Sequence, residues 1–152
     1  MKNDNASKVD TVPLLIDDFE QVIAYSDKLI KQHHPHLLTA NIRYLCRNKA
    51  PKSQGKLVPG VIKKASPIEK HLSGSEADFI MMISLDVWNS MPAAQRLALV
   101  DHLLTRCVAS EDEKTGKLKF SMRSPDVQEF AEVVSRNGLW NEQIAEFVDS
   151  AK

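Results

Sequence analysis

The sequence predicts an α+β protein in which a small three-stranded sheet packs against helices. Apolar residues recur at helical spacing over residues 14–32 and 92–108, whereas three segments between residues 37 and 86 alternate or run apolar, as strands do. With 152 residues, of which 43% are hydrophobic, the chain can bury one core of ordinary size. We therefore expect a single domain over residues 13–152, preceded by a flexible arm at residues 1–12, which are polar and lack an apolar period.

The first helix is expected over residues 14–32. It should end before Pro35, because the residue ahead of a proline is driven away from helical angles. LLTANIRYLCR at 37–47 and KLVPGVIKKAS at 56–66 are expected to form a hairpin joined by the turn-forming KAPKSQG, with Pro59 placing the second strand at an edge. The apolar run ADFIMMISLD at 77–86 predicts a buried third strand.

The second half of the chain is predicted to be mainly helical. LDVWNS forms a short helical turn, and Pro92 opens a longer helix whose apolar face continues to Cys107. KLKFSM is expected to be extended. Pro125 opens a further helix, which turns Phe130 inward and ends at an Asn-Gly pair, and NEQIAEFVDS forms a last amphipathic helix.

Two tryptophans and two cysteines are expected in the core. Trp88 and Trp140 lie among apolar neighbours, so we expect both to anchor packing, and exposure of either would instead indicate a partner site. Cys46 and Cys107 are expected to be reduced thiols, which suits a cytoplasmic protein. No apolar run approaches the roughly 20 residues of a membrane span, and the polar start is unlike a secretory signal, so we expect no membrane association.

Charge is segregated along the chain although the net charge is zero. Residues 28–68 contain no Asp or Glu, whereas residues 126–152 are rich in acids. One interpretation is a solvated surface on which the two halves neutralise each other. The other is a face for nucleic acid or an acidic protein. Its candidate residues are Arg43, Arg47, Lys49, Lys52, Lys56, Lys63 and Lys64.

Two short segments carry the chemistry that the sequence suggests, DHLLTRC at 101–107 and PDVQEF at 125–130. The chain resembles the phage metallopeptidases, which are small zincin-like enzymes. In that family these two segments read D-H-E-L-x-H-C and H-D-x-x-E-F. The resemblance also extends over HPHLLTANIRYLCR, ADFIMMIS, QRLALVDH and RNGLW. The resemblance covers most of the chain and implies a zincin-like domain encoded by a phage. In the intact motif, two histidines four apart on one helix face bind zinc, and the glutamate acts as base for the metal-bound water.

This sequence departs from the family motif at three of its four positions. By the resemblance, His102 matches the first ligand, Leu103 replaces the base, and Arg106 and Pro125 replace the other two ligands. A catalytic zinc normally has three protein ligands, and a guanidinium would repel it. Loss of the base alone removes a factor of roughly 10² to 10⁴ in rate. We therefore expect no zinc, no catalytic residue and a protein that is not an enzyme.

The residues of the former site suggest a replacement for the metal. The hypothesis is a cavity in which Arg106 pairs with Asp126 or Glu129, so that the guanidinium replaces the metal cation and the carboxylates replace its ligands. His102 is then either the remnant ligand in this cavity or a helix histidine that forms a hydrogen bond with a neighbouring residue. HHPH at 33–36 is a second metal candidate, but no Cys or acid completes it, and histidines at a helix end often bind the last carbonyls.

The leading functional hypothesis is a non-catalytic relative that binds a macromolecule, either a host protein or a nucleic-acid enzyme, in the host cytoplasm during infection. One alternative is a metal-dependent hydrolase: a peptidase with an unorthodox ligand set, or a nuclease holding Mg²⁺ through Asp101, Asp126 and Glu129. Another is a nucleic-acid-binding protein that uses the basic residues between 28 and 64. No P-loop, G-x-G-x-x-G or nucleophile elbow supports nucleotide or acyl-transfer chemistry.

Overall fold

A four-stranded mixed sheet is the centre of the molecule. The computed structural model describes residues 11–12, 16–68 and 77–152. The strands lie in the order β1 (Thr11–Val12), β2 (Ile42–Arg47), β6 (Phe79–Ser84) and β5 (Gly60–Lys64). The three predicted strands are therefore confirmed, and the last two residues of the predicted arm add a fourth. Residues 1–10 of that arm lie outside the described residues.

The predicted hairpin between the first two long strands is wrong. β6 lies between β2 and β5, parallel to the former and antiparallel to the latter. The turn-forming stretch closes a separate small hairpin instead, β3 (Lys52–Ser53) with β4 (Lys56–Leu57). Positive φ angles at Gln54 (53°) and Gly55 (79°) suit the two-residue loops that match the twist of a hairpin. β5 starts directly after Pro59 and forms an edge, as the proline predicted.

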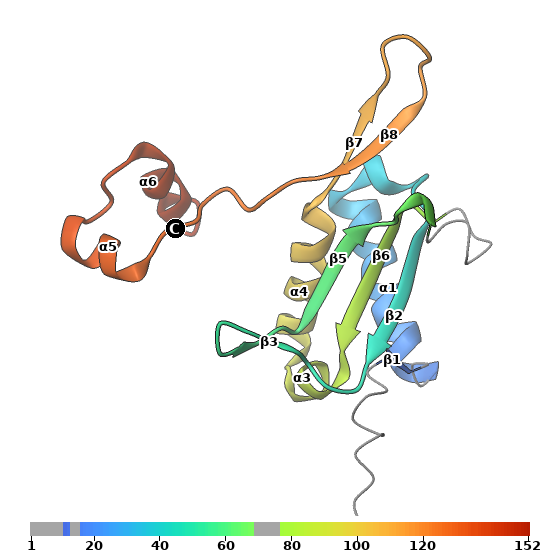
Figure 1. Ribbon diagram of the computed structural model, residues 1–152, viewed down its shortest axis with the longest axis horizontal. Coiled ribbons are helices and arrows are strands. Elements are labelled where there is room, and N and C mark those ends of the chain that lie inside the picture. The colour runs from blue at the N-terminus through green and yellow to red at the C-terminus, as the bar shows by residue number, and fades with distance from the viewer. Residues whose placement is uncertain (1–10, 13–15, 69–76) are drawn as a thin grey trace, which may run out of the picture.

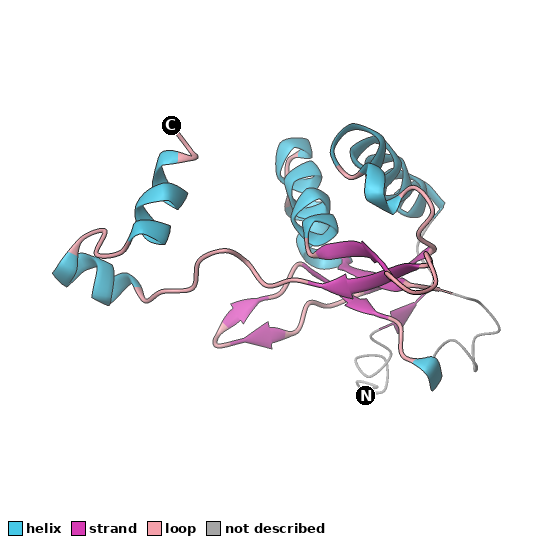
Figure 2. Ribbon diagram, turned by 90° about the horizontal axis from the view of Figure 1, so that it is seen from above, coloured by secondary structure: helices cyan, strands magenta, loops and turns pink. Residues whose placement is uncertain are grey.

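Helices α1 (Ile16–His33) and α4 (Ala93–Thr105) lie together on one face of the sheet (Figure 2). Alternation along β6 turns Phe79, Met81 and Ile83 toward these helices, where all three are fully buried. From α4, Val100, Leu103 and Leu104 enter the same core. The apolar face of the sheet and the apolar faces of the two helices thus meet in one core layer.

Trp88 joins the helices at one end of this core. It belongs to α3 (Leu85–Ser90), is completely buried as predicted, and donates from Nε1 to Oε1 of Gln21 in α1 at 3.2 Å. Arg96 of α4 donates to the same Gln21 oxygen at 2.8 Å and to the Trp88 carbonyl at 2.9 Å. Its guanidinium lies 5.3 Å from the centre of the indole ring, which adds a cation–π contact.

The helix that carries the motif ends earlier than predicted. Thr105 is its last residue, and Cys107 begins a strand, β7 (Cys107–Glu111), which pairs with β8 (Leu118–Met122) in a hairpin that extends from the body (Figure 1). Cys107 is buried here as a strand residue. Its burial satisfies the apolar pattern from either type of element, which is why the spacing alone mispredicted the boundary.

The C-terminal helices stand apart from the rest of the molecule. Residues 123–130 are an extended segment, which we call the tether, and it leads to α5 (Ala131–Asn137) and α6 (Glu142–Asp149), away from the sheet (Figure 1). The prediction that Pro125 opens a helix is wrong, whereas the end of that helix at Gly138, with φ of 70°, is confirmed. Phe130 is 72% exposed and Trp140 53% exposed, so the predictions that they pack inward are also wrong. No helix among the described residues has the length and apolarity needed to cross a membrane.

Candidate functional site

Helix α4 sets the positions of the motif residues by simple helical geometry. Val100, Leu103 and Leu104 face the core, whereas Gln95, Ala98, His102 and Thr105 form the solvent-facing side. His102, the remnant ligand, is therefore exposed, and it forms no hydrogen bond with any described residue. The hydrogen bond between His102 and a neighbouring residue, which the sequence suggested, is therefore absent among the described residues.

Leu103 occupies the position of the catalytic base and is part of the core. Its side chain is 2% exposed, and its Cδ1 lies above Gly60 of β5, 3.2 Å from where a Cβ on that glycine would stand. Cδ1 of Ile83 lies at the same 3.2 Å from that point. A glutamate at position 103 would place its carboxylate in this apolar contact, where an isolated charge is strongly disfavoured.

Arg106 lies at the C-terminus of α4 and forms no ion pair with an acidic side chain among the described residues. Its Nε donates to the carbonyl of Arg123 at 3.3 Å, and the Arg123 amide donates back to the Arg106 carbonyl at 2.8 Å. Asp126 pairs with Arg123, from Nη2 to Oδ1 at 2.8 Å. Glu129 accepts from the amide of Phe130. The structure thus differs from the predicted pairing of Arg106 with Asp126 or Glu129, because Arg123 is nearer to the acid in sequence and takes its place.

The histidines at the end of α1 are held by two contacts that sequence spacing did not predict. His34 is buried, and its Nε2 donates to Oδ1 of Asp101 in α4 at 2.7 Å. His36 donates from Nε2 to the carbonyl of Cys107 at 3.0 Å. Both partners lie far along the chain, so no local signal could have indicated them. Histidines were expected to bind helix carbonyls, but neither contact is to the end of α1.

These histidines border a shallow cavity of about 420 Å³ with Thr105, Val108 and Arg123. Cys107 lies beside it as a buried thiol. Burial raises the pKa of Cys107 to about 12, while the nearby Arg106 lowers it to a lesser extent. The thiol is therefore protonated at neutral pH and is a poor nucleophile and metal ligand. Cys46 is also buried, and neither cysteine forms a disulfide, as predicted.

The described residues do not assemble a metal site. No group of three or more of their His, Cys, Asp and Glu side chains is arranged to hold an ion. Asp101, Asp126 and Glu129, the acids considered for Mg²⁺, have the separate partners given above, His34, Arg123 and the Phe130 amide. HHPH likewise separates into two different contacts.

The predicted basic face is partly assembled by the sheet. The register places Arg43, Leu45 and Arg47 of β2 beside Ile80 and Met82 of β6 and Val61 and Lys63 of β5, on the side opposite α1 and α4. We call this side the open face. Lys52 and Lys56 belong to the β3–β4 hairpin, Lys49 to the loop before it, and Lys64 points to the other side of β5. Three of the seven predicted residues therefore share one surface.

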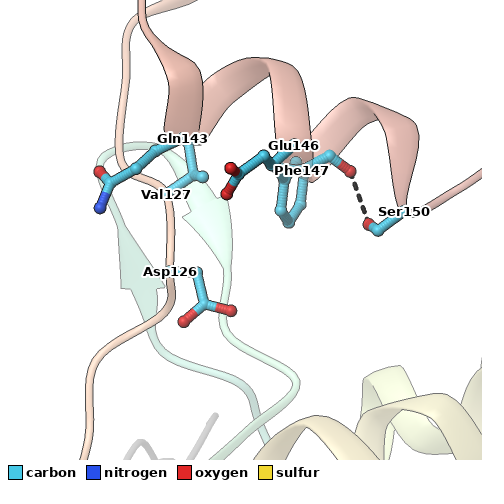
Figure 3. Close-up of a pocket in the computed structure, with 6 residues that line it drawn as sticks. All are labelled: Asp126, Val127, Gln143, Glu146, Phe147 and Ser150. Carbon is cyan, nitrogen blue, oxygen red and sulfur yellow. Dashed lines mark hydrogen bonds between the residues drawn. The ribbon is translucent and has the colours of Figure 1, made fainter.

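A second cavity lies on the C-terminal part of the chain. It measures about 350 Å³ and is bordered by Asp126 and Val127 of the tether and by one side of α6 (Figure 3). The carboxylates of Asp126 and Glu146 and the ring of Phe147 border the same space. The sequence shows the acids of this region, but their convergence was not predicted, because Asp126 was expected to lie in a helix.

One protein family matches most of the chain. The model of the family described as "Putative phage metallopeptidase" matches residues 18–152, which include the three longer strands of the sheet, α4 and both C-terminal helices. Searches of curated proteins and of solved structures found no match. The mixed α+β domain is consistent with a zincin-like fold. The chain belongs to the phage metallopeptidase family.

Proposed function

We propose that this protein is a non-catalytic member of its family that acts by binding a macromolecular partner. The observation that carries the proposal is the placement of Leu103. The family's base position is not merely changed to another polar group but is part of the packed core against Gly60. The leucine side chain there is shielded from water and has no group that could accept a proton.

The family implies zinc, and the residues at the motif positions do not fit it. His102 can donate one imidazole nitrogen, whereas Arg106 presents a permanent cation one helical turn away and Pro125 has no donor. Arg106 is also occupied by the Arg123 carbonyl, which closes the end of α4 without a metal.

The partner that we propose is a protein, either a host protein or a nucleic-acid enzyme, met in the host cytoplasm during infection. The phage context rests on the family. Support for a protein partner comes from large apolar side chains that remain exposed, above all Trp140 and Phe130. Exposed aromatic side chains are enriched where proteins bind proteins.

Peptide hydrolysis with added zinc tests the proposal. The purified chain and its His102→Ala variant are compared on unfolded casein and on mixed peptides, before and after dialysis against Zn²⁺. We expect no hydrolysis above the buffer rate for either protein. Hydrolysis that requires zinc and disappears in His102→Ala would contradict the proposal and favour a hydrolase with an unorthodox ligand set.

Nucleic-acid binding is a second candidate, favoured by the position of Arg43, Arg47 and Lys63 on the open face. Fluorescence anisotropy with short single- and double-stranded oligonucleotides, between about 50 and 200 mM salt, tests it. Binding through these cations must weaken steeply with salt and fall in Arg43→Glu and Lys63→Glu. Absence of binding at the lowest salt would remove this candidate.

A further inference from the structure

The C-terminal part of the chain is not stabilised by the body of the molecule. Helices α5 and α6 have seven and eight residues and lie apart from the sheet, α1 and α4 in both views (Figures 1 and 2). Isolated helices shorter than about 12–15 residues are marginal in water. The α5–α6 pair therefore requires a further surface against which to pack.

The α5–α6 pair also exposes the apolar side chains that such packing would bury. Phe130, directly before α5, is 72% exposed, and Phe147 of α6 is 57% exposed. Between the helices, Leu139 is 47% and Trp140 53% exposed. Large aromatic residues left in water on a short, separate unit are typical of an interface rather than of a solvated surface.

The open face of the sheet has a matching character. Leu45, Met82 and Val61 are neighbours across its three main strands, and Val61 is 39% exposed. Beside them, the guanidinium of Arg47 donates from Nε and Nη2 to the sulfur of Met82, at 2.9 and 2.7 Å. A thioether is a weak acceptor, so a carboxylate brought to this position would be a stronger partner for the arginine.

Helix α6 would bring such carboxylates. It contains Glu142, Glu146 and Asp149 and no Lys or Arg. Glu146 and Asp126 border the cavity of about 350 Å³ together with the ring of Phe147 (Figure 3). Asp126 already pairs with Arg123, so Glu146 and the ring of Phe147 are the groups that suit an incoming arginine or lysine side chain.

We infer that the α5–α6 pair of one copy docks on the open face of a second copy, and that reciprocal exchange closes a two-fold dimer. The tether favours a second copy over the chain's own sheet. The two backbone-directed bonds between Arg106 and Arg123 fix its start, and from there it runs away from the sheet (Figure 1). Exchange of a terminal element between identical copies is a low-cost route to a closed dimer.

This inference does not rest on the proposed loss of catalysis, because a dimer can form whether or not the chain is catalytic. It assigns Phe130 and Trp140, the exposed side chains named above in support of a protein partner, to contact with a second copy of the chain. Sedimentation velocity and light scattering over about 1–100 µM are the test. We expect the wild-type mass to be twice 17.1 kDa at the upper concentrations. Trp140→Ser and Arg47→Glu should each raise the dimer dissociation constant at least tenfold, since one removes an apolar contact and the other a cation. Both side chains lie outside the buried core, so the variants should fold.

Leu118→Ser is the matched control, because Leu118 is equally exposed at 52% but lies in the β7–β8 hairpin. It should dimerise like the wild type. A wild-type monomer at every concentration would overturn the inference. So would a dimer insensitive to Arg47→Glu, which would mean that another surface is used. A monomer in which acrylamide fails to quench Trp140, identified by comparison with Trp140→Phe, would show docking on the chain's own sheet and would likewise overturn it.

Addition of an oligonucleotide distinguishes this dimer interface from a nucleic-acid-binding surface. If the open face holds a second copy, an added oligonucleotide should not change the sedimenting mass at about 150 mM salt. A monomer that binds the oligonucleotide through Arg43 and Arg47 would overturn the inference in favour of the nucleic-acid candidate.

Discussion

At the scale of single residues, Leu103 carries most of the functional argument. His102 alone would be compatible with many sites, because it is an exposed helix histidine. Leu103 is more informative, since its side chain fills the space above Gly60 and beside Ile83. Changing Leu103 back to the glutamate of the family motif would therefore alter the stability of the protein as well as its chemistry.

Restoring glutamate at position 103 should destabilise the fold. We expect Leu103→Ala to lower the free energy of unfolding by about 2–5 kcal/mol, and Leu103→Glu to lower it at least as much at pH 7, because a charge is buried as well. The loss in Leu103→Glu should diminish at pH 4, where the carboxyl is protonated. Urea unfolding at both pH values measures this. Leu103→Met, with nearly the same volume, is the control and should cost less than about 1.5 kcal/mol. A fully stable Leu103→Glu would contradict the core assignment.

Cys107 should be inert in the folded protein. Because burial raises the pKa of Cys107 from 9.0 to about 12, its thiolate is scarce at pH 8. Labelling with iodoacetamide at pH 8, followed by peptide mass spectrometry, should modify Cys107 only after urea is added. Below pH 9 the thiol is neutral in both the folded and the unfolded state, and the fold keeps its full stability. As the pH rises from 9 toward 12, the unfolded thiol ionises first, so the free energy of unfolding falls. Native Cys107 that reacts at the rate of the unfolded chain would disprove the burial argument.

At the scale of elements, the sequence predicted which segments form the sheet but not how they pair. The apolar run of β6 marked it as buried, and Pro59 marked β5 as an edge. The hairpin between β2 and β5 was the natural expectation because they are consecutive and joined by a turn. However, one face of β6 is completely buried, and β6 pairs with β2 along one edge and with β5 along the other, so it lies between them in the sheet. Such competition between distant strands leaves no local signal.

The candidate site was predictable only where a motif spans a few residues. Positions 102, 103 and 106 could be read from one helix, and their consequences followed from residue type. The bond from His34 to Asp101 and the exchange of bonds between Arg106 and Arg123 depend on tertiary contacts. Pro125 misled the prediction because a proline that opens a helix has the same local signature as a proline within an extended tether.

The stability of α6 should depend on its cap. Asn141 accepts a hydrogen bond from the amide of Ile144 at 2.9 Å through its side chain. Asn141→Ala should destabilise the helix by about 1 kcal/mol, which corresponds to roughly fivefold faster amide exchange in α6. Hydrogen exchange followed by NMR or mass spectrometry measures this. Asn141→Ser keeps an acceptor and should change little, and equal exchange in Asn141→Ala and wild type would show that the cap does not limit α6.

At the scale of the whole molecule, direct contacts between side chains connect the helices of a mixed α+β domain that is consistent with the fold of its family. The core between the sheet and α1, α3 and α4 is continuous, and Gln21, Trp88 and Arg96 connect the three helices. The end of α4 is joined to the tether by direct bonds from Arg106. We therefore expect folding to be independent of zinc.

The zinc content of the purified protein distinguishes a non-catalytic member of the family from a metal enzyme. The tag-free protein, expressed with zinc in the medium, is analysed by plasma mass spectrometry, and its melting temperature is recorded with and without EDTA. We expect far less than one zinc per chain and the same melting temperature in both solutions. One zinc per chain with a melting temperature that falls in EDTA would contradict it, because His102 would then have found ligands that the motif lacks.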